Sequence, residues 1–173
     1  MSSGYRRPAI RAAGRAGWRR SKIGGVPESG SSVPASVQVW RALQRVYVDL
    51  RPELDAELRR GHGMPASWYD MLVELAGTTR LRMSDLGETM VLSRTRVSRL
   101  VTELEARGLV TRETNPADGR SAYVAITAAG RQRLHEATPH HHAVVDQHFA
   151  GLAADELGAL ATALHKVLAE DRP

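Results

Sequence analysis

The chain has 173 residues, 42% of them apolar, which suits one compact domain with a buried core and argues against a wholly disordered protein. It contains no cysteine, which excludes disulfides, thiolate metal sites and a nucleophilic cysteine. No run of about 18 apolar residues could span a bilayer, and no apolar stretch follows the N-terminal arginines as a secretory signal requires. We therefore expect a cytoplasmic protein that has no membrane partner.

The net charge of +5 is distributed unevenly along the chain. Residues 1–36 hold seven of the 24 cations and one of the 19 anions, so the remainder, with 17 cations and 18 anions, is close to neutral. An argument for nucleic-acid binding must therefore rest on where charge lies within the domain. Residues 1–34 are rich in Gly, Ser, Arg and Ala, which predicts a flexible basic arm that is either solvated or in contact with phosphates.

Apolar residues at spacings of three and four predict two helices after this arm. The first spans about 36–61, with Ser36 able to cap its first turn and a kink expected at Pro52. The second follows Pro65 and stops at Gly77.

A pair of short helices joined by a brief turn is predicted within about 83–107. Ser93 can cap the second helix of the pair, and Gly108 follows its end. That helix has an apolar face and an opposite face with a polar and basic leading end. A short partner followed by such a helix is typical of a helix-turn-helix motif.

Two strand-like runs, 109–112 and 123–126, flank a segment dense in turn formers and predict a hairpin over about 109–126. Two helices then occupy about 127–171, with Thr127 as a cap and a bend expected at Pro139. The predicted fold is mainly α with a small two-stranded β-wing. It is a winged helix-turn-helix with flanking N- and C-terminal dimerisation helices, all within a single domain over 35–173.

This arrangement resembles the MarR family of bacterial transcriptional regulators over about 36–169. The resemblance is carried by LGETMVLSRTRVSRLVTELEARGL at 86–109, by the wing triplet Asp118-Gly119-Arg120, and by ITAAG at 126–130. Two positions depart from the family pattern. Arg82 stands where relatives often place a Thr or Ser cap, and Gly87 stands where Ala is usual.

The resemblance implies a homodimer that binds a pseudo-palindromic site in double-stranded DNA as a repressor, with no enzymatic activity and no cofactor. The chain also lacks a Gly-rich phosphate loop, HExxH and GxSxG. Arginines early in the second helix of the motif suit base reading, although a solvated charged face is the alternative. In the wing, the resemblance makes Arg120 a minor-groove or backbone contact that Asp118 orients, and Arg112 is a weaker phosphate candidate. The predicted DNA contacts are Ser93, Arg94, Thr95, Arg96, Ser98, Arg99, Arg112, Asp118 and Arg120.

Four of the eight aromatic residues fall in the first two helices, close in sequence to cations. Core and dimer packing is the simpler account of them. The family resemblance implies a small aromatic or phenolic effector in a crevice between the dimer helices and the DNA-binding part, where apolar walls and a cation are needed. The candidate ligand residues are Trp40, Arg41, Arg45, Tyr47, His62, Trp68 and Tyr69.

Two alternatives remain open. The seven histidines suggest a metal-responsive regulator, but adjacent helical residues such as His140, His141 and His142 point in different directions and cannot form one tetrahedral site, so we predict no metal. A winged helix used only for protein contacts would bind DNA at background strength and without sensitivity to salt.

Overall fold

A computed structural model describes residues 33–115 and 118–169, and all of their side chains except those within 115–121. The predicted basic arm, apart from its last two residues, lies outside the described residues. In chain order the elements are α1 (Ala35–His62), α2 (Ala66–Ala76), β1 (Leu81–Arg82), α3 (Met83–Thr89), α4 (Arg94–Glu105), β2 (Val110–Asn115), β3 (Asp118–Ile126), α5 (Ala128–Phe149) and α6 (Ala154–Ala169). This is the predicted order, with one strand added.

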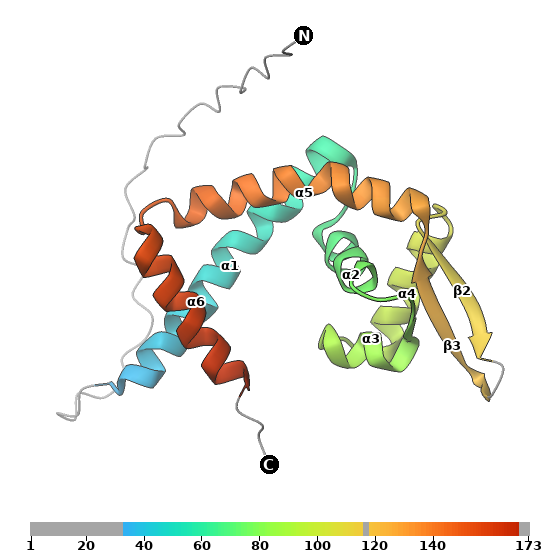
Figure 1. The fold of residues 1–173 in the computed structure, drawn as a ribbon, viewed down its shortest axis with the longest axis horizontal. Coiled ribbons are helices and arrows are strands. Elements are labelled where there is room, and N and C mark those ends of the chain that lie inside the picture. Colours follow the sequence, from blue (N-terminus) through green and yellow to red (C-terminus); the bar gives the residue numbers. More distant parts are fainter. Residues whose placement is uncertain (1–32, 116–117, 170–173) are drawn as a thin grey trace, which may run out of the picture.

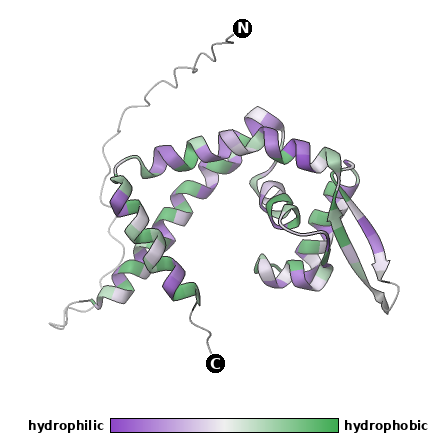
Figure 2. Ribbon diagram, in the orientation of Figure 1, coloured by the Kyte–Doolittle hydropathy of each residue, from purple (hydrophilic) through white to green (hydrophobic). Residues whose placement is uncertain are grey.

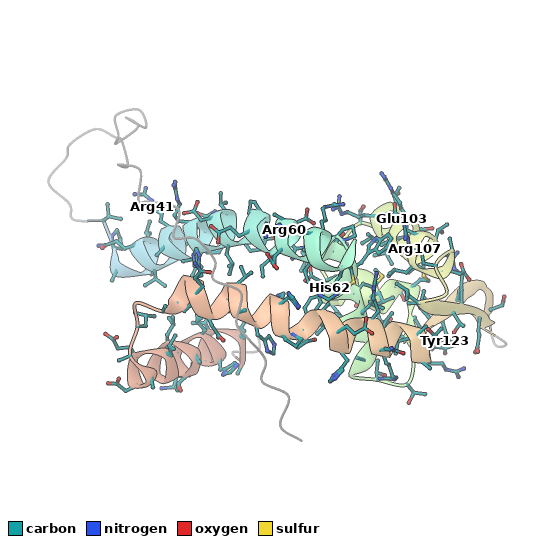
Figure 3. All side chains as sticks on the ribbon, turned by 90° about the horizontal axis from the view of Figure 1, so that it is seen from above. Arg41, Arg60, His62, Glu103, Arg107 and Tyr123 are labelled. Carbon is teal, nitrogen blue, oxygen red and sulfur yellow. The ribbon has the colours of Figure 1, made fainter. Side chains whose placement is uncertain are left out.

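The elements gather at two ends of the molecule (Figure 1). At one end, α2, α3, α4 and the sheet lie together; at the other, α6 lies near the N-terminal half of α1 in this view. The long helices α1 and α5 connect the two ends and lie beside each other in Figure 3 as well. Because α1 and α5 each reach from one end to the other, their packing against each other fixes the position of one end relative to the other.

The hydrophobic core belongs to the end that contains the sheet. Fully buried side chains come from α1, from α2 to α4 and from the two hairpin strands, and they include Leu58 of α1, Leu72 of α2, Leu86 of α3, Val101 of α4 and Val124 of β3. The apolar face predicted for α4 is the face that packs into this core. The helix α6, in contrast, contributes no buried residue.

The sheet has three antiparallel strands in the order β1-β3-β2, so the predicted hairpin of β2 and β3 is present and a short third strand, which the sequence did not predict, is added to it. The short strand β1 pairs with the base of the wing, with Leu81 opposite Val124 and Arg82 opposite Tyr123. The hairpin strands are also longer than predicted, since β2 continues through polar residues to Asn115. Hydrogen bonds between β2 and β3 hold this polar outer part of the hairpin together, and it has no alternation of apolar residues that the sequence could have signalled.

Two of the three predicted N-cap residues are confirmed, and one is wrong. Ser93 and Thr127 each accept a hydrogen bond from a backbone N–H in the first turn of the following helix, at 3.3 Å and 3.0 Å. Ser36 does not cap α1, because the helix begins one residue earlier and Pro34 occupies the cap position. The helices α1 and α5 continue through Pro52 and Pro139.

Candidate nucleic-acid interface

The leading end of α4 is a polar surface backed by the core. Ser93 starts the helix, while Val97 and Leu100 are buried on its inner side. The outer side carries every residue of the motif that the sequence predicts to contact DNA, and all of them are exposed: Ser93, Arg94, Thr95, Arg96, Ser98 and Arg99. The structure therefore brings the six residues together on one accessible face.

The arginines of this face differ in their partners. Among the described residues, Arg94 and Arg96 have no carboxylate within ion-pair distance, whereas Nε of Arg99 contacts Oε1 of Glu103 at 2.9 Å. The other carboxylate oxygen of Glu103 accepts a hydrogen bond from the indole Nε1 of Trp68 at 3.0 Å. The hydrogen bond from Trp68, followed by that from Arg99, lowers the pKa of Glu103. Arg99 is thus held by a carboxylate that stays ionised at neutral pH.

Arg112 of β2 is half-buried and reaches back to α4. Its Nη2 donates to Oγ1 of Thr102 at 3.1 Å and lies 3.4 Å from Oε2 of Glu105. These contacts join the wing to α4, and a phosphate contact by Arg112 stays a prediction. Asp118 and Arg120 lie on β3, but their side chains are outside the described part, so their predicted roles stay predictions too.

The turn between α3 and α4 contains a strained residue that sequence reasoning missed. Val91 has φ 52°, in the left-handed region that β-branched residues rarely adopt, and it is 90% exposed. The backbone on either side is fixed, because Leu92 N–H donates to the carbonyl of Gly87 at 2.9 Å. A Cβ at Gly87 would lie 3.2 Å from the carbonyl oxygen of Leu92, which accounts for glycine at this departure from the family pattern.

The predicted ligand residues do not form one site. Trp40 and Tyr47 are 60% and 65% exposed on α1, and Arg41 and Arg45 are exposed beside them, whereas Trp68 and Tyr69 are buried in the core. Figure 3 places Arg41 near one end of α1 and His62 at the other. At about 1.5 Å of rise per residue, their 21-residue separation is about 30 Å. A single small molecule cannot touch all seven residues within one chain.

A groove of about 350 Å³ does unite two of them, His62 and Trp68. It lies between the end of α1, the start of α2, the segment after α4 and the first half of α5. Arg107 stacks over the Trp68 ring at 4.7 Å, and Arg133 donates to the carbonyl of His62 at 2.6 Å. Burial, and then the nearby charges of His140 and Arg133, lower the pKa of His62. Tyr69 lies elsewhere, stacked on His141 at 4.3 Å between ring centroids.

His62, His140 and His141 make ring contacts between helices. His140 lies edge-on to His62 and has its Nδ1 3.5 Å from Glu57, while His141 stacks on Tyr69. Within 33–115 and 118–169, no three His, Asp or Glu side chains gather as a metal site needs. The metal-responsive alternative thus receives no support from these residues.

Apolar side chains are exposed at the end of the molecule opposite the core. They belong to α6 and the N-terminal half of α1, where the ribbon of Figure 2 carries many residues in the hydrophobic colour. The most exposed include Val39, Trp40, Tyr47, Val48, Val167 and Leu168. Lone exposed apolar residues are common, but several on the same pair of helices are typical of an interface. None of the described helices is both long and apolar enough to cross a membrane.

A short helix, a tight turn, a capped helix with an exposed basic face and a β-hairpin together define a winged helix-turn-helix protein. A family model described as "MarR family" matches residues 62–121. Two crystal structures from Streptomyces coelicolor are similar over most of their length. Sco3205, a MarR family transcriptional regulator in complex with DNA, is 32% identical, covers 85% of this chain and 94% of its own, and has a TM-score of 0.70.

The second structure is AbsC, another MarR family transcriptional regulator, which is 31% identical over 80% of this chain and 95% of its own, with a TM-score of 0.67. Among curated proteins, the uncharacterized HTH-type transcriptional regulator YkoM of Bacillus subtilis is 25% identical over 134 residues, 78% of this chain and 86% of the relative. The chain belongs to the MarR family of transcriptional regulators.

Proposed function

We propose that the protein is a repressor that binds a pseudo-palindromic operator as a homodimer. The leading end of α4 enters the major groove, and the hairpin of β2 and β3 contacts the neighbouring backbone or minor groove. In this arrangement Arg96 and Arg99 read base edges, Arg112 and Arg120 contact phosphates or the minor groove, and Asp118 orients Arg120. Occupying the operator then excludes polymerase.

One observation carries the proposal, namely the exposed leading end of α4. An ordinary surface helix of a soluble protein alternates cations with acidic residues, whereas Arg94 and Arg96 face solvent without a carboxylate partner among the described residues. Guanidinium groups at the start of the second helix of such a motif are placed to meet guanine O6 and N7. Sco3205, which is similar over most of its length, was crystallised with DNA.

Dimerisation is supported by the exposed apolar side chains of α1 and α6. With no buried residue in α6, packing within its own chain does little to balance the cost of exposing Leu157, Leu160 and Leu168. A second copy of the same surface, related by a two-fold axis, would cover it. The two-fold axis would also place two α4 helices in successive major grooves, with half-site centres about 10 bp apart.

The test is a gel shift on the DNA upstream of the protein's own gene, at several salt concentrations. The proposal expects binding that is tighter than to unrelated duplex and that weakens steeply as salt rises. Binding at background strength, without salt dependence, would instead favour a winged helix used for protein contacts. Raised transcription of the adjacent gene after deletion of the regulator distinguishes a repressor from an activator.

The groove at His62 and Trp68 favours a second property, release from DNA by a small aromatic anion. Its volume is within the range of small-molecule sites, it has an aromatic wall, and Arg107 and Arg133 supply positive charge. Salicylate as a probe should raise the melting temperature of the protein and weaken the gel shift. An Arg133→Ala variant that responds to salicylate as the wild type does would locate the effector elsewhere.

A further inference from the structure

A second groove, of about 210 Å³, lies between the start of α2 and α4, and it includes Arg59, which the sequence did not single out. Its basic side chains come from two elements, Arg59 of α1 on one side and Arg96 and Arg99 of α4 on the other, and Ser67 of α2 also lines it. Glu103 also lines the groove, so one carboxylate there faces three arginines, and an added anion would reduce the remaining repulsion between like charges.

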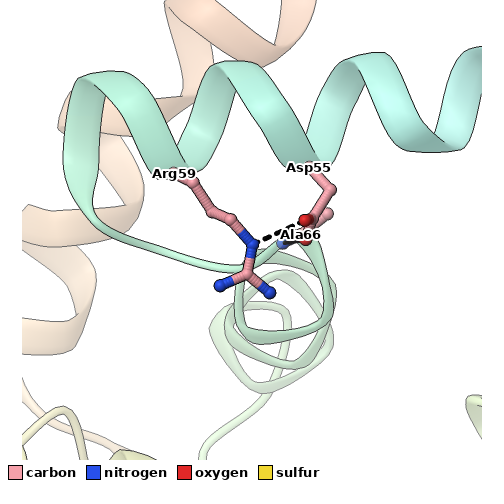
Figure 4. A network of polar contacts seen from close by, with 3 residues as sticks. All are labelled: Asp55, Arg59 and Ala66. Atoms are coloured by element: carbon pink, nitrogen blue, oxygen red, sulfur yellow. Dashed lines mark hydrogen bonds and ion pairs between the residues drawn. The ribbon is translucent and has the colours of Figure 1, made fainter.

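Arg59 is held in place by a carboxylate that does two things. Oδ2 of Asp55 accepts a hydrogen bond from Nε of Arg59 at 2.6 Å, and Oδ1 accepts one from the backbone N–H of Ala66 at 2.9 Å (Figure 4). Burial alone would raise the pKa of Asp55, but the hydrogen bonds from Arg59 and Ala66 lower it, so the carboxylate is ionised at neutral pH. Both terminal nitrogens of Arg59 point away from Asp55 in Figure 4.

The opposite wall repeats this arrangement. Arg99 also uses Nε for its carboxylate partner, Glu103, and both oxygens of Glu103 are occupied, one by Arg99 and one by Trp68. Among the described residues, no hydrogen bond engages the terminal nitrogens of Arg59 or Arg99, and Arg96 has no ion-pair partner. Counting Asp55 and Glu103 against the three arginines leaves the groove with one net positive charge and several free donors.

The size of the groove favours a small anionic group. Its volume is below the roughly 300 Å³ at which small-molecule sites begin, yet it is several times the ~30 Å³ that a water molecule occupies. Its wall includes Arg96 and Arg99, which belong to the face that the proposed function assigns to the operator. A phosphate of the DNA backbone at the edge of the major groove has the charge, the size and the acceptor oxygens that this groove matches.

Resting on the proposed function, we propose that the groove between α2 and α4 seats one backbone phosphate of each operator half-site, with Arg59 as its main contact. Arg59 belongs neither to the helix-turn-helix motif nor to the wing. This phosphate contact adds affinity and fixes the angle of α4 in the DNA major groove, but it does not read the base sequence.

The test compares Arg59→Ala with Arg60→Ala in the full-length protein. Arg60 is the adjacent arginine of α1, 73% exposed and paired with Glu57 at 2.8 Å, so it matches Arg59 in charge and helix position but lies outside the groove. Arg59→Ala should weaken binding to operator and to unrelated duplex by the same factor, on the order of tenfold, and make the salt slope shallower by about 0.9. Arg60→Ala should change neither.

A second experiment identifies the DNA phosphate that Arg59 contacts. Operator duplexes that carry one methylphosphonate at a time remove the charge of single phosphates, and the wild type should lose affinity at one position per half-site where Arg59→Ala loses none. Circular dichroism melts of both variants guard against misfolding. Equal binding by the two variants, while the wild type binds with a steep salt slope, would overturn this inference alone. A wild type that binds no duplex would overturn it together with the proposed function.

Two other outcomes would also contradict the proposal that this groove binds a backbone phosphate. If Arg59→Ala weakens the operator but not unrelated duplex, Arg59 reads a base. If inorganic phosphate binds the free protein through Arg59 in calorimetry, and no methylphosphonate position depends on Arg59, the groove is a site for a free anion.

Discussion

The indole Nε1 of Trp68 donates a 3.0 Å hydrogen bond to Oε2 of Glu103 and so joins α2 to α4 across the core surface. Trp68 lines both grooves, the larger one beside α5 and the smaller one beside Arg96 and Arg99. Because Glu103 also holds Arg99, a displacement of Trp68 is transmitted to an arginine on the DNA-facing surface through two hydrogen bonds. The residue is therefore a physical link between the proposed effector groove and α4.

Replacing Trp68 with Phe keeps an aromatic ring in the core and removes the donor. We expect a loss of about 1 kcal/mol in the free energy of unfolding at pH 7, because Glu103 loses a hydrogen bond to an ionised group. The pKa of Glu103 is lowered in the folded protein, so its stabilisation is present above the ordinary glutamate value of 4.5 and disappears as the pH falls through the lower folded value.

Urea denaturation at pH 7 and at pH 3 measures this difference between wild type and Trp68→Phe. The difference should be larger at pH 7. A difference of the same size at both pH values would mean that ring packing, and not the hydrogen bond to Glu103, accounts for the loss.

Arg96→Ala and Arg99→Ala should each cost about 1 to 3 kcal/mol of operator binding and relax preference at one base position, because a guanidinium that reads guanine is lost. Because Glu103 pairs with Arg99 and not with Arg96, changing Glu103 should affect only one of the two contacts. Glu103→Gln should leave the Arg96 contact unchanged and alter base preference only where Arg99 reads. Binding assays on operators with single base changes provide the measurement, and operator preference intact in both alanine variants would place base reading elsewhere.

Local signals predict the DNA-binding helices well. The Ser93 cap and the apolar spacing of Val97, Leu100 and Leu104 lie within one helix, and they fix both its start and its buried face. The leading end opposite that face then has to be exposed. The strand β1 is not predictable in this way, because it is two residues long and its pairing with β3 joins positions about 40 residues apart.

The ligand and phosphate grooves mark the limit of sequence reasoning. Trp40 and Trp68 both lie in helices with apolar spacing, yet one is exposed and the other buried, because burial depends on the elements that pack against each helix. Arg59 and Arg60 are adjacent in one helix, so the sequence predicts that they point in different directions but not which of them faces α4. Only the turn into α2, which brings Ala66 against Asp55, directs Arg59 and not Arg60 toward α4.

Val91→Gly should stabilise the protein by about 1 kcal/mol, because glycine adopts a positive φ without the steric cost that a β-branched residue bears. The control is Val73→Gly, at an exposed valine inside α2, which should destabilise by about 0.5 to 1 kcal/mol. Thermal melts of the two variants give opposite shifts. A lower melting temperature for Val91→Gly would mean that the Val91 side chain makes a compensating contact.

Leu160→Asp should convert the dimer to a monomer at micromolar concentration, because a carboxylate would be buried in the proposed interface. The monomer should stay folded, since α6 contributes no buried residue to its own chain. Light scattering measures the mass, and Val73→Asp, an exposed apolar position outside α1 and α6, serves as the control. A wild type that is already monomeric would contradict the dimer directly.

Gly130, in the first turn of α5, tests how the wing is joined to the helix that follows it. A Cβ at this position would overlap with the carbonyl oxygen of Leu109 and approach Cγ1 of Ile126 to 2.8 Å. Neither can move freely, because the Leu109 carbonyl accepts the Thr127 N–H at 3.1 Å and Ile126 is buried at the end of β3. Gly130→Ala should therefore cost about 1 to 3 kcal/mol through overpacking.

Gly61→Ala provides the matched control, because it is also a helical glycine and its Cβ would meet only Nδ1 of His140 at an ordinary 3.8 Å. That substitution should raise stability by up to about 1 kcal/mol through helix propensity. Urea denaturation of both variants decides the matter. If Gly130→Ala proves as stable as the wild type, the start of α5 can shift away from Leu109, and the close contact there does not constrain the angle between wing and helix.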